Sequence, residues 1–162
     1  MMTPIDCLTP AEIRATAHVA LGLTSGEIAI KLRLARGTVD GQLRHAQYKL
    51  GVNSRTVLIH RCYAREQLPR PDRIKSSQEA DAAEVELLQF LALGASHAEM
   101  EQRNSHGLSQ HGAKARIKAL RERWGAKNDP HLITRAWEFG VLDESQPKDG
   151  ALWLRGTPAV LR

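Results

Sequence analysis

The 162-residue chain carries a formal net charge of +5, with 42% hydrophobic and 4% aromatic residues. This length fits one ordinary domain or two small domains of roughly 60 residues each, and the basic excess favours nucleic acid over a membrane as the partner because no long apolar run is present. Neither a secretory signal nor a cysteine-based zinc site is expected, because the N-terminus lacks an apolar core and only Cys7 and Cys62 occur, as in proteins of a reducing cytoplasm.

Two helix starts follow one another in the first thirty residues. Thr9 and Glu12 have the spacing of a capping box, and a helix is expected from there to about Leu21. Thr24 and Glu27 have the same spacing and predict a second, shorter helix. Gly22 is expected to end the first helix, and a tight turn at residues 33–37 is expected to join the second helix to the next one.

A polar helix with one apolar stripe comes next. Val39, Leu43, Ala46 and Leu50 recur at helical intervals, as on the buried side of an amphipathic helix, and Gly51 supplies a left-handed stop. The opposite face could contact phosphates and base edges, although a solvated face is the plainer alternative. The candidate DNA-binding residues on this helix are Arg36, Thr38, Asp40, Gln42, Arg44, His45 and Lys49.

Several short motifs keep their spacing without a gap through the first third of the chain. They are Leu8-Thr9-Pro10-x-Glu12, Ala20-x-Gly22-Leu23-Thr24, Glu27-Ile28-Ala29-x-x-Leu32, Thr38-Val39 and Lys49-Leu50-Gly51-Val52-x-x-Arg55. Over residues 8–68 the sequence thus resembles the LuxR, FixJ and GerE type of DNA-binding domain, a four-helix module of bacterial transcription regulators. The resemblance implies a helix-turn-helix whose recognition helix enters the major groove. It also implies a fourth helix, roughly Arg55 to Gln67, which in the family often carries the dimer contact.

Three positions depart from the family's pattern. Asp40 stands where the family usually has a lysine that reaches the DNA, Gln42 replaces the usual histidine, and Ala35 replaces the serine N-cap. A carboxylate repels phosphates unless it accepts a hydrogen bond from a cytosine amino group. The missing cap costs about 1 kcal/mol of helix stability. The first unit is therefore expected either to bind an unusual sequence or to have lost part of its DNA role.

The second half of the chain repeats the first. Pro69 and Pro71 cannot continue a helix, so residues 69–76 are predicted to form a linker. A capping box at Ser76 to Glu79 predicts a helix over residues 80–93. Three stretches then align with the first half: residues 91–100 with 19–28, 112–126 with 38–52, and 132–137 with 58–63. This pattern predicts a duplicated, diverged copy over residues 77–142.

The second copy matches the first poorly in its scaffold, but its recognition helix is better suited to DNA binding. Glu101 and Asn104 occupy places that are apolar in the first copy, whereas Ser109 restores the N-cap and Lys114 stands at the family's lysine position. The candidate DNA-binding residues here are Ser109, Lys114, Arg116, Lys118 and Arg121. The tail, residues 143–162, contains a short apolar patch at residues 151–154 that is expected to dock on the body of the protein.

No motif for catalysis or for a cofactor is present, and His97, His106 and His111 lack the neighbouring ligands of a metal site. The sequence therefore predicts an all-α protein with two tandem four-helix LuxR-type domains and a proline-containing linker. We expect it to bind double-stranded DNA in the cytoplasm, associated with the nucleoid, without an enzymatic activity. Homodimerisation through the fourth helices stays open. The alternative is a protein-interaction module that binds a regulator or RNA polymerase and has reduced or no DNA binding.

Overall fold

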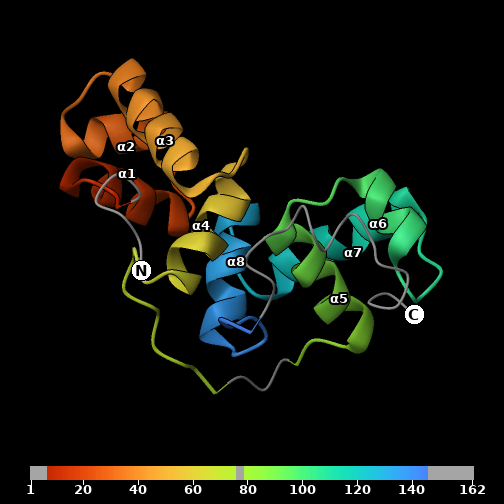
Figure 1. The fold of residues 1–162 in the computed structure, drawn as a ribbon. Coiled ribbons are helices and arrows are strands. Elements are labelled where there is room, and N and C mark those ends of the chain that lie inside the picture. Colours follow the sequence, from red (N-terminus) through yellow and green to blue (C-terminus); the bar gives the residue numbers. More distant parts are fainter. Residues whose placement is uncertain (1–6, 76–78, 146–162) are drawn as a thin grey trace.

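The computed structural model describes residues 7–75 and 79–145. These residues form eight helices and no strand, which confirms the expected all-α class (Figure 1). The predicted tail patch at residues 151–154 lies outside the described residues. The helices are α1 (Pro10–Ala20), α2 (Ser25–Leu32), α3 (Arg36–Leu50), α4 (Arg55–Ala64), α5 (Ala82–Leu93), α6 (His97–Arg103), α7 (Gln110–Arg123) and α8 (Asp129–Glu138).

The first three helices begin and pack as their local sequence predicts. Both capping boxes are present, at Thr9 with Glu12 and at Thr24 with Glu27. All four residues of the apolar stripe of α3 are buried, and Gly51 ends that helix with a φ of 66°. The stripe packs against α1, α2 and α4, so the polar side of α3 is left at the surface.

Two predicted helix ends differ from the structure. Helix α4 stops at Ala64 because Glu66 has a left-handed backbone, with a φ of 57°. Helix α5 begins after Asp81, which forms a capping box with Glu84. Residues 76–78 of the expected capping box lie outside the described residues, and the box that the structure shows is five residues further along the chain.

Helix α4 lies at the centre of the molecule. It packs against α3 and α1 on one side and against α5 and α8 on the other, and every residue from Val57 to Ala64 is buried. Buried apolar side chains from α1–α4 and from α5–α8 belong to one continuous cluster. Two independent domains over residues 8–68 and 77–142 therefore stay a prediction, since a shared core joins the two groups of helices.

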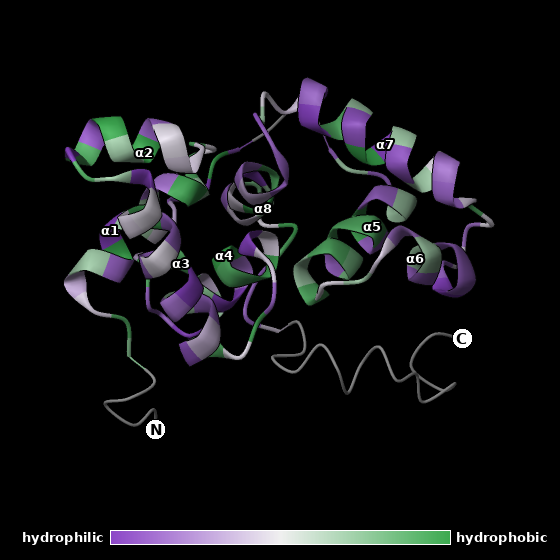
Figure 2. Ribbon diagram, turned by 90° about the horizontal axis from the view of Figure 1, so that it is seen from above, coloured by the Kyte–Doolittle hydropathy of each residue, from purple (hydrophilic) through white to green (hydrophobic). Residues whose placement is uncertain are grey.

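The two helix pairs that follow α1 and α5 lie on the same side of the molecule. In Figure 1, α2 and α3 lie above α1, and α6 and α7 lie above α5. Figure 2, seen from above, places α3 and α7 on opposite sides of the central α4 and α8. None of the helices in the described part of the chain combines the length and the apolar character that crossing a lipid bilayer requires.

Candidate nucleic-acid interface

The polar face of α3 exposes four of its seven predicted DNA-binding residues. Arg36, Thr38, Arg44 and His45 are exposed, whereas Gln42 is half-buried. The side-chain oxygen of Gln42 is shielded from solvent and has no hydrogen-bond partner among the described residues. Ala35 forms no side-chain cap, because alanine has no hydrogen-bond acceptor in its side chain. The exposed basic side chains of this face are thus Arg36 at the start of α3 and Arg44 in its middle.

The carboxylate of Asp40 is bonded to side chains of two neighbouring helices. It accepts hydrogen bonds from the Ser25 hydroxyl and from the Arg55 guanidinium, the latter at 2.9 Å, and Arg36 lies 3.9 Å away. The Ser25 hydrogen bond, together with the bond from Arg55, holds the pKa of Asp40 below its ordinary value. The negative charge that seemed unfavourable beside DNA is therefore balanced by two arginines, and it joins α3 to α2 and α4.

Lys49 also has an internal partner. Its Nζ donates to a Glu12 carboxylate oxygen at 2.8 Å and to the carbonyl oxygen of Cys7 at 3.3 Å. Burial raises the pKa of Glu12, but hydrogen bonds from Lys49 and Thr9 outweigh it and hold that pKa below the ordinary value. The predicted role of Lys49 in DNA binding stays untested, and its visible role is to join the end of α3 to the start of α1.

Helix α7 begins at the N-cap that the sequence predicts. The Ser109 hydroxyl accepts a hydrogen bond from the Gly112 amide at 3.0 Å. Ala113, Ile117 and Leu120 are buried beneath the helix. Lys114 and Lys118 are exposed on its outer side, and neither forms an ion pair with any residue that the structure describes. These two lysines are one turn apart and point from the same side of the helix.

Three arginines of α7 already have carboxylate partners. Arg116 lies 3.0 Å from Asp81, Arg121 pairs with Asp129, and Arg123 lies 2.6 Å from Glu84. Of the predicted DNA-binding residues, Arg116 and Arg121 are thus engaged in surface ion pairs. The free positive charge of this helix is therefore smaller than its sequence alone suggests.

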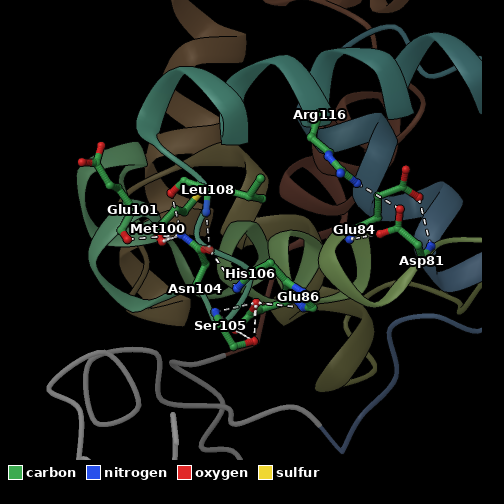
Figure 3. Close-up of polar contacts among 10 residues, drawn as sticks. All are labelled: Asp81, Glu84, Glu86, Met100, Glu101, Asn104, Ser105, His106, Leu108 and Arg116. Carbon is green, nitrogen blue, oxygen red and sulfur yellow. Dashed lines mark hydrogen bonds and ion pairs between the residues drawn. The ribbon is translucent and has the colours of Figure 1, made fainter.

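Asn104 organises the turn between α6 and α7, a role that the sequence did not reveal (Figure 3). Its side-chain amide donates to the carbonyls of Met100 and Leu108, at 2.7 and 2.8 Å, and its oxygen accepts from the amides of His106 and Leu108. On the adjoining side of the turn, Glu86 accepts from the Ser105 amide and lies 3.5 Å from His106. The turn spans residues 104–109, compared with 33–35 in the first half, and Asn104 closes the longer loop.

Among the described residues, no group of three or more His, Cys, Asp or Glu side chains could hold a metal ion.

Residues 6–62 match the model of the family of bacterial regulatory proteins called the luxR family, or GerE. A LuxR-type helix-turn-helix domain thus lies at the start of the chain, which confirms this part of the resemblance. The match ends within α4, so a second copy stays a prediction.

The chain is also similar to a protein of Streptomyces halstedii named a probable HTH-type transcriptional regulator, GfsR. The two are 41% identical over 59 residues, which is 36% of this chain and 24% of that protein. The match thus spans about a quarter of the length of that relative. No solved structure matches the chain. The names of the family and of this relative both point to transcription regulation.

Proposed function

We propose that this protein is a sequence-specific transcriptional regulator that binds double-stranded DNA through two helix-turn-helix units. The LuxR-type domain over residues 6–62 carries the proposal, because the second helix of such a motif lies in the major groove and contacts base edges there. In this assignment α3 is the recognition helix of the first unit. Arg36, Thr38, Arg44 and His45 are its exposed candidates for DNA contact.

The proposal extends to α6 and α7 as a second helix-turn-helix. Its support is the aligned sequence of the two halves, the N-cap at Ser109, and the exposed Lys114 and Lys118. Either lysine is long enough to reach a phosphate or the O6 and N7 acceptors of guanine. Arg116 can contribute as well, because its ion pair with Asp81 is exposed and therefore weak, so a phosphate can replace the carboxylate. The partly buried pair of Arg121 with Asp129 is less easily replaced.

The roles of Asp40 and Lys49 differ from those of the exposed residues in this proposal. Both are bonded to other helices of the first unit, so they position α3 and do not act as its main DNA contacts. The hydrogen bond from Ser25 and the pairing with Arg55 offset the Asp40 charge and so reduce its repulsion of a nearby phosphate. The first unit therefore keeps a DNA-binding role in spite of its departures from the family's pattern.

The test is a selection of duplexes from a random library with the purified full chain, followed by a salt titration on the best sequence. A defined motif is expected, with an affinity that falls steeply as salt rises, because each phosphate contact releases a counterion. The double variant Lys114→Ala and Lys118→Ala is expected to weaken binding and to reduce the salt slope by about two. Lys75→Ala is the matched control, because Lys75 is an exposed lysine outside both helix pairs.

A protein-interaction module is the second candidate. Ile30 on α2 and Tyr48 on α3 support it, since their side chains are 81% and 86% exposed and contact with phosphates does not require apolar groups. Under this alternative a regulator or RNA polymerase would bind the outer side of α2 and α3. Ile30→Ser and Tyr48→Ser would then abolish partner binding, whereas the lysine variants would leave it unchanged, and the selection would yield no motif.

A further inference from the structure

Helices α4 and α8 are joined by two side-chain hydrogen bonds in the buried centre of the molecule. The indole nitrogen of Trp137 donates to Nδ1 of His60 at 3.1 Å, and the hydroxyls of Tyr63 and Thr134 lie 3.1 Å apart. All four residues are at most 5% exposed. In the alignment of the two halves, Thr134 corresponds to His60 and Trp137 corresponds to Tyr63. The position of His60 in the first half is thus bonded to the position of Tyr63 in the second half, which is Trp137. The reverse contact is also present, because Tyr63 of the first half is bonded to Thr134, the equivalent of His60.

A second pair of contacts has the same reciprocal form. A Cβ atom added at Gly22 would lie 3.2 Å from the Cβ of His131, and one added at Gly94 would lie 3.0 Å from Val57. Gly94 corresponds to Gly22, and His131 to Val57, in the same alignment. In each half, the glycine after the first helix (α1 or α5) thus lies against the beginning of the last helix of the other half (α8 or α4).

Reciprocal contacts are characteristic of two-fold symmetry. When two equivalent bodies meet across a two-fold axis, residue i of one contacts residue j of the other, and j of the first contacts i of the second. A head-to-tail arrangement would pair different positions and would not return the same contact in reverse. Figure 2 fits the first case, because α3 and α7 lie on opposite sides of the α4 and α8 pair.

We propose that the junction of α4 and α8 is an internal dimer interface, so that one chain presents α3 and α7 to a single duplex as an inverted pair. This inference rests on the proposed function and adds the architecture of the DNA target, an inverted repeat bound by one molecule. Residues Val57–Ala64 of α4 are already buried within the chain, so this surface is closed to the α4 of a second molecule.

The two halves of this inverted repeat differ in sequence. Lys118 corresponds to Arg44, so both recognition helices carry an exposed basic residue at that position. Lys114 corresponds to Asp40, so α7 carries an exposed lysine at the position where α3 carries a carboxylate that is bonded to Arg55 of α4. The half-sites therefore resemble each other near the Arg44 and Lys118 contacts, and they differ where Lys114 approaches the DNA.

The experiment uses the full chain and the best duplex from the random selection. The expected motif is an inverted repeat with centres about one helical turn apart, roughly 10 base pairs, and native mass spectrometry is expected to show one chain per duplex. Reversing one half to make a direct repeat, or adding half a turn of DNA between the halves, should weaken binding at least about tenfold, because one bidentate base contact alone is worth that much. A direct-repeat motif or two chains on each duplex would overturn the inference while leaving the proposed function intact.

A substitution at the exposed lysine tests the assignment of helices to half-sites. Lys114→Asp should change the preferred bases in one half of the repeat and leave the other half unchanged, with Lys75→Asp as the control that changes neither. Equal changes in both halves would contradict the inverted pair, because each half would then be bound by α7 of a separate molecule. A complete absence of selected sequences would overturn the proposed function, and this inference with it.

Discussion

The Nζ atom of Lys49 lies 2.8 Å from a carboxylate oxygen of Glu12, and this ion pair joins the last turn of α3 to the first turn of α1. The Glu12 side chain is only 7% exposed and also completes the cap of α1. The same carboxylate therefore caps α1 and holds the end of α3 against it.

Lys49→Met is expected to destabilise the fold by roughly 1 to 3 kcal/mol, because it leaves a largely buried carboxylate without its partner. Urea unfolding of the variant measures this loss. Arg44→Met is the matched control on the same helix, because Arg44 is exposed, and its effect on stability should stay within about 0.5 kcal/mol. If both variants lose the same stability, the Glu12 pair is not the cause.

Ala35→Ser should stabilise the protein by about 1 kcal/mol. Ala35 has the extended backbone of an N-cap, with φ −70° and ψ 144°, but it offers no side-chain acceptor to α3. Ser109 has nearly the same backbone and does cap α7, so Ser109→Ala should cost a similar amount. Thermal unfolding of the two single variants and of the double variant measures both changes. Equal stabilities of the wild type and Ala35→Ser would show that the first turn of α3 gains nothing from a cap.

The parts of this fold that the sequence predicted correctly are those that depend on neighbours within one helix. The capping box at Thr9 and the stripe from Val39 to Leu50 follow from spacing alone, because a helix returns to the same face every three or four residues. The start of α5 was misplaced for a related reason. Ser76 and Asp81 both have a glutamate three residues later, so the local pattern cannot choose between them.

The contacts that decide the candidate site depend on which helices meet. Asp40 contacts Ser25 and Arg55 only because α2, α3 and α4 pack together. These partners are distant in the sequence, so the sequence alone does not indicate that the carboxylate is paired. The packing of α4 against α8 could likewise not be predicted, although the sequence alignment shows that residues of the two helices are equivalent. Repetition in a sequence indicates similar units, but it does not reveal how the units pack together.

Asn104→Ala should destabilise the region of α6 and α7 by about 2 kcal/mol or more. The substitution removes five hydrogen bonds to the backbone, including those to the partly buried amide and carbonyl of Leu108. Hydrogen exchange of the amides of His106 and Leu108 measures the opening of this turn. Asn53→Ala is the control, because Asn53 is an exposed asparagine beyond the end of α3. Unchanged exchange at both amides would contradict the role assigned to Asn104.

The stability of the junction between α4 and α8 should decrease in mild acid. Burial lowers the pKa of His60 from 6.5 to about 4, the positive charge of Arg61 adds to this effect, and the carboxylate of Asp143 opposes it. In the unfolded chain His60 takes up a proton near pH 6.5, whereas in the folded protein it does so only near pH 4. Acid therefore favours the unfolded chain, and the stability present above pH 6.5 is lost as the pH falls toward 4. Between pH 7.5 and pH 5 this difference amounts to about 2 kcal/mol.

Urea unfolding at several pH values between 5 and 7.5 checks this expectation. His60→Asn is the informative variant, because an amide oxygen can still accept the hydrogen bond of Trp137 but does not titrate. The variant should be less stable than the wild type at pH 7.5, since asparagine fills less of the buried site, and its stability should change less between pH 7.5 and 5. His45→Asn is the control, because His45 is exposed on α3 and its replacement should leave the pH dependence as it is. An equal loss of stability in the wild type and in His60→Asn would assign the acid sensitivity to other groups.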